Sequence, residues 1–475
     1  MSVRTFDLFI GGQWRRGGRL SEIRNPFGGD VVARVCEASA DDVDAAIGAA
    51  AAAAPLLRGE GAWKRVAVLR AIAAGIERRQ GELAEMICLE AGKPIQYARS
   101  EAARAVETFS FAADEAARLG GELLPLDVSR SGQGRTGITR RVPRGPVSAI
   151  TPFNFPLNLV AHKLAPALAC GCPVVLKPAP ETPATAMMLA EIVAEAGAMP
   201  GALSVVHAPV EAAAALIDDP RMRSLSFTGS AAVGWELKAR AKKKHVTLEL
   251  GGNAAVVVEP DADLERALPR IVMGAFAYSG QICISVQRIL VAESLAPAFL
   301  PGLVEATQKL AKCGDPRAED VMVGPLIRAR DADRVMSWIE EARSRGARVL
   351  CGGTRDGTLI APTILTNVDA GTKISCQEVF GPVVVVQTYR SFDEALGMVN
   401  DSAYGLQCGL YSNDLRKVWQ AFAELEVGAI IHNDVPVFRV DSMPYGGVKD
   451  SGFGREGLRY AIEALTEIRL LALNP

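Results

Sequence analysis

A cysteine and a carboxylate supply the residue types needed for covalent chemistry. Cys283 lies in the short segment 280–285, after an apolar run over 271–278 that is typical of a buried helix. Glu249 lies 34 residues earlier, inside the otherwise apolar segment 248–252. A thiol can attack an electrophilic carbon and a carboxylate can take up a proton, and together they provide the two parts of acyl chemistry. Each residue also has a structural interpretation, because cysteines often fill cores and buried glutamates often form ion pairs.

The elements that would position these residues alternate from residue 146 onwards. Short apolar strands are predicted at 147–150, 173–177, 203–206, 225–227 and 246–250, with helices over 157–169 and 183–196. This alternation predicts a parallel, doubly wound α/β sheet, whose ligands bind beyond the carboxyl ends of the strands. Thr151, Lys177, Thr228 and Glu249 fall at or near those ends. The sequence therefore predicts a binding site at this edge of the sheet.

The segment 227–234 is predicted to run from a strand through a turn into a helix. Gly229 and Ser230 would then present backbone N–H groups at a helix N-terminus, where a pyrophosphate is stabilised. The spacing is not G-x-G-x-x-G, so an ordinary glycine turn is the alternative.

The remaining segments predict further elements. Small antiparallel strands are expected over 6–35, and helices from Asp41, over 63–90 and over 97–119. The polar segment 122–145 predicts an extended hairpin that needs a partner, with a flexible loop as the alternative. A second α/β unit follows Cys283, and the apolar tail 468–473 predicts a strand that seeks a sheet edge.

The composition is that of a globular protein. The 475 residues are 49% hydrophobic and 22% charged, and the net charge of −2 implies neither a nucleic acid nor a membrane partner. Nine cysteines without C-x-x-C spacing argue against a disulfide framework or a zinc site, so no metal is predicted. Free thiols and the absence of an apolar signal in residues 1–10 favour the cytoplasm.

Seven segments, taken together and in order, resemble the aldehyde dehydrogenase superfamily. They are Thr151-Pro152-Phe153-Asn154-Phe155-Pro156, Lys177-Pro178, Phe227-Thr228-Gly229-Ser230, Glu249-Leu250-Gly251-Gly252, Gly280-Gln281-Ile282-Cys283, Glu378-Val379-Phe380-Gly381-Pro382 and the loop 444–454. The resemblance covers nearly the whole chain and implies oxidation of a small aldehyde to its acid with a nicotinamide cofactor. It also implies a doubly wound cofactor domain (1–121 and 143–250), an α/β catalytic domain (251–440) and a small β oligomerisation arm (122–142 and 460–475). A homodimer or homotetramer is therefore expected.

The resemblance assigns roles to individual residues. Cys283 would be the nucleophile that forms a thiohemiacetal and then a thioester, and its site would be expected to lower the pKa of the thiol. Asn154 and the Cys283 N–H would form the oxyanion hole, and Glu249 would activate the hydrolytic water. Lys163 resembles a lysine that helps to relay protons, with a solvated or helix-capping role as the alternative. The residues assigned to the cofactor are Thr151, Phe153, Lys177, Pro180, Gly229, Ser230, Val233, Leu250, Glu378 and Phe380.

One departure from the family pattern concerns the cofactor. Pro180 stands three residues after Lys177, where NAD-selective members often carry a carboxylate that repels a 2′-phosphate. We therefore expect NAD to be used and NADP to be accepted.

Three residues are expected at the substrate end of the site. Arg104 and Arg439 come from places comparable to the substrate-mouth arginines of family members that oxidise acid-bearing aldehydes, and His162 lies near the presumed site. Two guanidinium groups would bind a carboxylate, sulfonate or phosphate tail. Ile282 argues against a phosphate, since some such members carry a further Arg there. In the alternative interpretation both arginines are surface ions, Arg104 pairing with Glu107 and Arg439 with Asp441.

The substrate expected from these residues is a small anionic aldehyde, such as a semialdehyde or glyceraldehyde phosphate, or a neutral hydroxyaldehyde such as lactaldehyde. Two other functions remain open at this stage. An acylating enzyme would pass the acyl group to coenzyme A, which Glu249 argues against. A catalytically retired structural homologue is opposed by the intact Cys283, Glu249 and Asn154.

Overall fold

The computed structural model describes residues 3–474 and contains two large, mostly parallel sheets. The first has the order β24-β12-β11-β8-β9-β10-β2-β3. Its strands are β2 (Leu8–Ile10), β3 (Gln13–Arg15), β8 (Val147–Ile150), β9 (Val174–Lys177), β10 (Leu203–Val205), β11 (Ser224–Thr228), β12 (His245–Glu249) and β24 (Gly452–Phe453). The central strands β12 to β10 are parallel, and β2, β3 and β24 are antiparallel additions at the edges. The predicted doubly wound α/β fold is confirmed.

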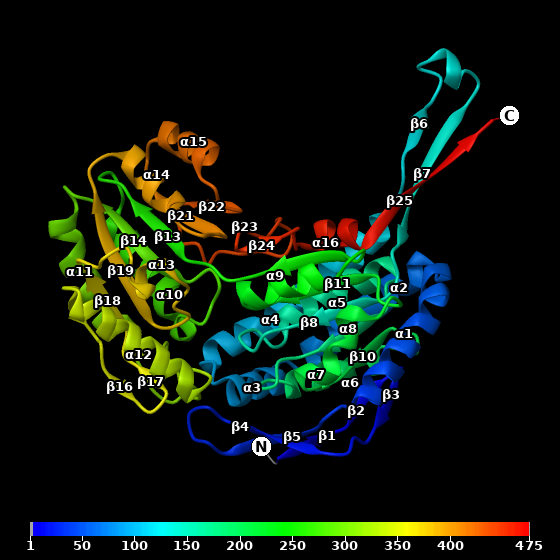
Figure 1. Ribbon diagram of the computed structural model, residues 1–475, viewed down its shortest axis with the longest axis horizontal. Helices are drawn as coiled ribbons and strands as arrows, with labels where there is room; N and C mark the ends of the chain where they lie inside the picture. Colours follow the sequence, from blue (N-terminus) through cyan, green and yellow to red (C-terminus); the bar gives the residue numbers. More distant parts are fainter. Residues whose placement is uncertain (1–2, 475) are drawn as a thin grey trace.

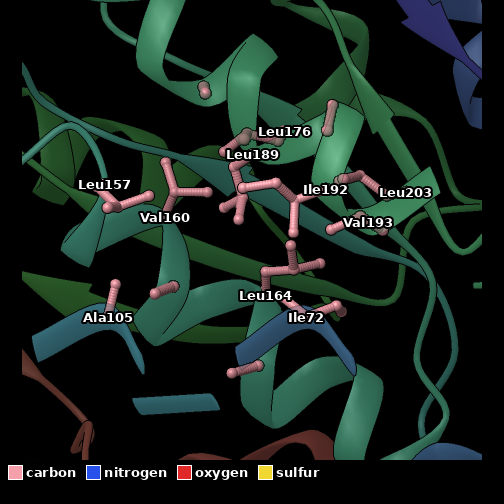
Figure 2. Close-up of a cluster of buried hydrophobic side chains, with 14 of the residues drawn as sticks. Ile72, Ala105, Leu157, Val160, Leu164, Leu176, Leu189, Ile192, Val193 and Leu203 are labelled. Atoms are coloured by element: carbon pink, nitrogen blue, oxygen red, sulfur yellow. The ribbon is translucent and has the colours of Figure 1, made fainter. Parts of the chain in front are cut away.

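Helices cover this sheet because its strands are apolar on both faces. They are α1 (Ala40–Gly59), α2 (Ala62–Arg78), α3 (Gln80–Ala91), α4 (Ile95–Arg118), α5 (Asn158–Cys170), α6 (Ala184–Glu195) and α9 (Ala231–Arg240). Figure 2 shows part of the core between them, where Ile72 of α2, Leu164 of α5 and Ile192 of α6 point toward one another. Every residue of α5 is buried, so this helix is the centre of the domain.

The prediction of a single helix over 63–90 is wrong. The chain leaves helical geometry at Arg79 (φ −108°, ψ 16°), and α3 starts anew at Gln80. The Arg79 side chain binds Glu82 and Glu191, and Gly81 follows in the first turn of α3. The apolar periodicity continues across this break, and therefore the sequence pattern does not reveal it.

Most strands of the second sheet come after Cys283 in the chain. The order of this sheet is β15-β18-β19-β14-β13-β21-β22, and among the described residues only β15 is antiparallel to its neighbour. Its strands are β13 (Ala254–Val258), β14 (Val286–Ala292), β15 (Arg348–Cys351), β18 (Thr363–Thr366), β19 (Val383–Tyr389), β21 (Gln407–Tyr411) and β22 (Ala429–His432). The helices around it are α10 (Leu264–Phe276), α11 (Ala296–Leu310), α12 (Ala329–Ser344), α14 (Phe392–Asn400) and α15 (Leu415–Glu424). Figure 1 shows the two sheets side by side, joined by the segments between them.

A three-stranded antiparallel arm projects from the body (Figure 1). It consists of β6 (Leu123–Pro125), β7 (Thr136–Pro143) and the C-terminal β25 (Thr466–Leu473). The tail pairs with β7 along its whole length, from Thr466 opposite Pro143 to Leu473 opposite Thr136. The predictions of a hairpin and of a tail strand at its edge are confirmed. The outer strand β25 leaves apolar side chains such as Ile468 and Leu471 exposed.

The shorter elements complete the fold. An N-terminal sheet joins β1 (Arg4–Phe6), β5 (Val31–Cys36) and β4 (Leu20–Arg24), and small pairs are formed by β16 (Arg355–Asp356) with β17 (Leu359–Ile360) and by β20 (Tyr404–Gly405) with β23 (Val448–Lys449). The short helices are η1 (Arg130–Gly132), α7 (Val210–Ala213), α8 (Ala215–Asp218), η2 (Ala277–Gly280), α13 (Lys373–Cys376) and α16 (Leu458–Leu465). Within residues 3–474 no helix is both long and apolar enough to cross a bilayer.

Two glycines of the second α/β unit allow a matched test of packing. A Cβ on Gly428 would lie 1.8 Å from the carbonyl oxygen of Gly446, whereas a Cβ on Gly397 in α14 meets no described atom within 4 Å. We expect Gly428→Ala to lower the free energy of unfolding by about 1–3 kcal/mol through overpacking. Gly397→Ala should raise it by about 0.5–1 kcal/mol through helix propensity. Denaturant titration of both variants measures the two changes in the free energy of unfolding. Equal changes would contradict the close approach of Gly428 to the Gly446 carbonyl.

Candidate active site

The parallel register brings the predicted strand ends to one edge of the first sheet. Ile150 lies opposite Lys177 and Thr228 opposite Glu249, so the loops that follow β8, β9, β11 and β12 leave the sheet together. Cys283 approaches from the other body. Helix α10 ends at Phe276, and η2 turns the chain through positive φ at Tyr278 and Ser279 before β14 begins.

The turn that carries Cys283 is anchored by buried side chains. Ser279 Oγ donates to the Gly324 carbonyl at 2.7 Å. Gln281 Nε2 donates to the Pro325 carbonyl at 3.2 Å, while its Oε1 accepts from the Ile327 N–H at 3.0 Å. These bonds hold the cysteine turn against the segment 324–327.

A cavity of about 320 Å³ gathers most of the predicted site residues. Those that line it are Arg104, Phe153, Asn154, His162, Gly229, Ser230, Leu250, Cys283, Glu378, Phe380 and Arg439. Five others do not line it, namely Thr151, Lys177, Pro180, Val233 and Glu249. Thr151 and Lys177 lie at the adjacent strand ends, where the Thr151 N–H donates to the Lys177 carbonyl at 3.2 Å. Pro180 and Val233 are exposed.

The sulfur of Cys283 lies 3.0 Å from the hydroxyl of Tyr445. Burial raises the pKa of the Cys283 thiol to about 12, and the nearby Glu378 and Glu249 add to the shift although Tyr445 opposes it. The expectation of a lowered thiol pKa is therefore not met by the protein groups alone. The sulfur is enclosed, and the two carboxylates together raise its pKa by more than Arg439 lowers it.

Asn154 contacts the same turn. Its Nδ2 donates to the carbonyl of Gln281 at 3.0 Å, two residues before the sulfur, and its side chain is buried. Its Oδ1 is buried without a hydrogen-bond partner in the part of the chain that the structure describes. The amide is thus held beside the sulfur, and its Oδ1 is free to accept a further hydrogen bond.

Glu249 lies behind the cavity, enclosed at the end of β12. Both of its carboxylate oxygens are buried and lack hydrogen-bond partners among residues 3–474. A Cβ on Gly446 would come within 2.8 Å of Oε1, so the backbone of the 444–454 loop closes over the carboxylate. Burial, together with the charge of Glu456, raises the pKa of Glu249 well above that of an ordinary carboxyl, against the influence of Arg439 and Lys163. Such a carboxylate is poised to take up a proton.

A buried charge network reaches the cavity through Arg104, His162 and Arg439. Asp441 accepts from Arg104 and Thr108 and lies 3.1 Å from His162 Nε2. Arg439 contacts His162 Nδ1 at 3.0 Å and donates to Glu456 Oε2 at 3.1 Å. The pairing expected in the surface-ion alternative is wrong for both arginines, because Arg104 pairs with Asp441 and Arg439 with Glu456.

The network continues toward the base. Lys163 Nζ donates to Glu456 Oε1 at 3.0 Å and to Thr228 Oγ1 at 2.7 Å, and it is buried rather than solvated or capping. Burial opposes ionisation of Glu456, but Lys163 and Arg439 together hold its pKa well below the usual range. Glu456 therefore stays ionised between Arg439 and Lys163, close to Glu249.

The other end of the cavity has groups suited to a dinucleotide. Gly229 and Ser230 lie at the N-terminus of α9, where Ser230 makes no side-chain capping bond to the first amides of the helix. The prediction that Gly229 presents its own amide is wrong, because its N–H donates to the Glu249 carbonyl at 3.0 Å. Glu378 accepts from the Gly252 N–H at 3.0 Å, and burial raises the pKa of its carboxyl to about 7. Phe153 and Phe380 meet edge to face with ring centroids 5.9 Å apart. Helix amides for phosphates, a carboxylate for a ribose and an aromatic pair beside the sulfur fit a nicotinamide dinucleotide.

Several site residues were not singled out from the sequence. Tyr445 and Glu456 were inside or beside the glycine-rich loop, and Asn158 lay one turn before His162. Glu181 follows Pro180, pairs with Arg328 at 2.7 Å and lies close enough to Lys177 to favour its charged form, although burial lowers the Lys177 pKa overall. Two features of the sequence point to these residues: an aromatic residue within a glycine-rich loop, and carboxylates next to a strand that is predicted to bind a ligand. No group of three metal-ligating side chains occurs in the described residues.

Comparison with known proteins agrees with this geometry. The family model "Aldehyde dehydrogenase family" matches residues 14–471. A 3-sulfolactaldehyde dehydrogenase of Priestia megaterium is 44% identical over 99% of this chain and 98% of that protein. The solved structure of aldehyde dehydrogenase 21 from Physcomitrella patens, in complex with the product succinate, is 42% identical with a TM-score of 0.98, covering 100% of this chain and 99% of that one.

A glyceraldehyde-3-phosphate dehydrogenase from Methanocaldococcus jannaschii, complexed with NADP, is 36% identical with a TM-score of 0.92, covering 96% of this chain and 100% of that one. The resemblance noted from the sequence is thereby confirmed. The chain belongs to the aldehyde dehydrogenase family and is an NAD(P)-dependent enzyme that oxidises an aldehyde to its carboxylic acid.

Proposed function

We propose that the substrate is a small aldehyde with an anionic tail, attacked by Cys283 and released as the acid by hydrolysis. The observation that carries this proposal is Arg439, which lines the cavity together with the sulfur. It is buried, and its Nε has no hydrogen-bond partner within residues 3–474. A carboxylate or sulfonate would accept from this N–H and from the neighbouring Arg104.

The charge balance of the network supports an anionic ligand. Leaving aside Glu249, whose pKa is raised chiefly by burial, the cations Arg104, Arg439 and Lys163 face the two carboxylates Asp441 and Glu456. One buried positive charge is thus left to be balanced, and a bound anion would supply the balance. Ile282 packs in the apolar cluster beside Tyr445, which favours a compact carboxylate or sulfonate over a phosphate. The sulfonate of one relative's named substrate and the succinate bound to another are anions of this size.

In the proposed mechanism Cys283 releases its thiol proton to solvent and its sulfur adds to the aldehyde carbon, so that the carbonyl electron pair moves to the oxygen. The Asn154 amide, held beside the sulfur, stabilises the oxyanion of the thiohemiacetal. The nicotinamide cofactor, when bound between the α9 amides and Glu378, supplies the hydride acceptor and a positive charge. With that acceptor bound, the carbon held by Cys283 would reach the oxidation level of a thioester. Glu249 then takes a proton from water, whose oxygen attacks the thioester carbon; the carbon–sulfur bond breaks, which releases the acid and restores the Cys283 sulfur.

The hydrolytic assignment rests on Glu249. An enclosed carboxylate with a raised pKa serves hydrolysis, which needs a base, and has no use in transfer to the thiolate of coenzyme A. A retired homologue is opposed by the retained sulfur, amide and carboxylate around one cavity.

We also propose the domain division expected from the sequence, with residues 122–142 and 460–475 as the oligomerisation arm. The support is the projecting arm itself, whose outer strand β25 exposes apolar side chains and a free edge in the described chain. A second copy of this chain would cover them, which gives a homodimer or homotetramer. A cytoplasmic location agrees with the nine free cysteines.

Replacing the base should separate the two chemical steps. We expect Glu249→Gln to keep a burst of reduced cofactor, because thioester formation does not use the carboxylate, and to slow the later phase at least tenfold. In the wild type the hydrolytic rate should rise with pH across a range well above the ordinary carboxyl pKa, since only ionised Glu249 accepts a proton. Stopped-flow traces measure both, and Cys283→Ala, which should show neither phase, is the control. An unchanged steady state in Glu249→Gln would remove Glu249 from this role.

Removing the buried arginine should affect anionic substrates selectively. Arg439→Ala should lower kcat/KM for an anionic aldehyde about thirty- to a hundredfold, which corresponds to a charge-assisted contact of about 2–3 kcal/mol. A neutral aldehyde of the same length should lose much less. The exposed Arg459, which pairs with Glu463 on the surface, gives the control variant Arg459→Ala. Equal losses for both aldehydes in Arg439→Ala would refute the anion site.

The adenosine end of the site sets the cofactor preference. Pro180 provides no carboxylate, and Glu181 is paired with Arg328, which reduces its repulsion of a 2′-phosphate. We expect NAD to be used and NADP to be accepted with less than a thousandfold discrimination in kcat/KM. Larger discrimination, about 4 kcal/mol, would mean that Glu181 supplies the missing repulsion, and Glu181→Gln would then relax it.

A further inference from the structure

A buried amide in the substrate cavity has a hydrogen-bonding group without a protein partner. Asn158, the first residue of α5, is 1% exposed and lines the cavity together with Cys283. Its Oδ1 has no hydrogen-bond partner anywhere in the described chain, 3–474. A buried polar atom of this kind destabilises the protein unless a ligand completes its hydrogen bonding.

No neighbouring side chain completes the hydrogen bonding of the Asn158 amide in the described chain. Phe155, Leu159 and Ile282, which line the cavity with it, are apolar. The polar residues Tyr97, Ser100 and Arg104 line a second, smaller hollow with Asn158, but within the described chain none of them bonds to its Oδ1. Its Nδ2 lies 3.4 Å from His162 Nε2. That ring nitrogen is better used as the donor to Asp441 at 3.1 Å, because Nδ1 on the other side of the ring accepts from Arg439. Whichever way the amide is turned, one of its polar atoms therefore stays available to a ligand.

The start of the helix that carries Asn158 is anchored by a buried carboxylate. The backbone N–H groups of Leu157 and Asn158 both donate to Glu101 Oε1, at 2.9 and 3.1 Å. Glu101 in turn pairs with the fully buried Lys93, whose ammonium lies 3.5 Å from the centre of the Phe155 ring. A side chain fixed by its helix and by a buried ion pair is suited to selecting a ligand group.

Its place in the chain locates the substrate atom that it would meet. Asn154, four residues earlier, bonds the Gln281 carbonyl beside the sulfur and is the residue proposed to hold the aldehyde oxygen. His162, four residues later, touches Arg439 of the proposed anion site. Asn158 contacts His162 and shares the cavity with Asn154 and Arg439, so we place it along the substrate between the aldehyde and the tail.

We propose that Asn158 binds a hydroxyl on the carbon between the aldehyde and the anionic tail. This assignment rests on the proposed anion site for the orientation of the substrate. The preferred substrate is then a small 2-hydroxyaldehyde with a carboxylate or sulfonate tail, rather than the corresponding semialdehyde without a hydroxyl. A hydroxyl both donates and accepts, so it suits either orientation of the amide. An ammonium at this carbon is disfavoured, because it donates only and would stand near the cations Arg104 and Arg439.

Four aldehydes test the hydroxyl and the tail independently. They are three-carbon aldehydes with and without a terminal sulfonate, each with and without a hydroxyl on the middle carbon. The wild type should prefer each hydroxylated aldehyde over its deoxy partner by about ten- to a hundredfold in kcat/KM. Asn158→Leu, of similar size, should bring this hydroxyl ratio close to one. Asn158→Ser should restore part of it, which a merely structural effect would not do.

The exposed Arg459 provides the matched control, because Arg459→Ala should leave both the hydroxyl ratio and the sulfonate ratio in place. A wild-type hydroxyl ratio near one, or a ratio that Asn158→Leu leaves unchanged, would overturn the role of Asn158 while the anion site stands. A sulfonate ratio near one in the wild type would instead refute the proposed function. Inhibition of the wild type by the hydroxylated and deoxy acid products gives a readout that depends on no variant. Equal inhibition by both acids would also overturn the hydroxyl assignment.

Discussion

The ion pair between Glu456 and Arg439 connects the two ends of the chemistry. Glu456 is enclosed with Lys163 and Arg439 on either side, and these cations outweigh the cost of burial and keep it ionised. Its negative charge then adds to burial in raising the pKa of Glu249. The arginine proposed for the substrate tail is thus held by the same carboxylate that helps to tune the proposed base. Binding and hydrolysis depend on one buried set of charges, in which removing one partner would leave another uncompensated.

The parts that could be predicted from sequence are those set by local patterns. Short apolar strands separated by helices predicted the parallel sheet, and parallel strands necessarily bring their carboxyl ends to one edge. Thr151, Lys177 and Glu249 were therefore placed correctly at that edge without knowledge of the strand order. The helix break at Arg79 was missed because a tertiary contact with Glu191, rather than a change in periodicity, accompanies it.

The charge pairing could not be predicted, because sequence displays only near neighbours. Arg104 binds a carboxylate 337 positions away, while Glu107 on its own helix was the apparent partner. The raised pKa of the Cys283 thiol escaped prediction for a similar reason. It depends chiefly on burial and then on Glu378, which arrives from a distant loop of the second body. Local sequence shows that ionisable residues are present, whereas their energies follow from the residues that the fold places around them.

Helix α5 shows how one element serves several tasks at once. Successive residues of a helix are turned by about 100°, so Asn158 and His162 share a face and Lys163 points to a neighbouring one. The first pair therefore reaches the substrate cavity, while Lys163 reaches Glu456 and Thr228 behind it. Because α5 is buried on all sides, each polar side chain on it needs a partner. His162 and Lys163 have theirs within the described chain. The incomplete bonding of Asn158 is thus a property of the cavity, since the helix itself offers no surface through which solvent could satisfy the amide.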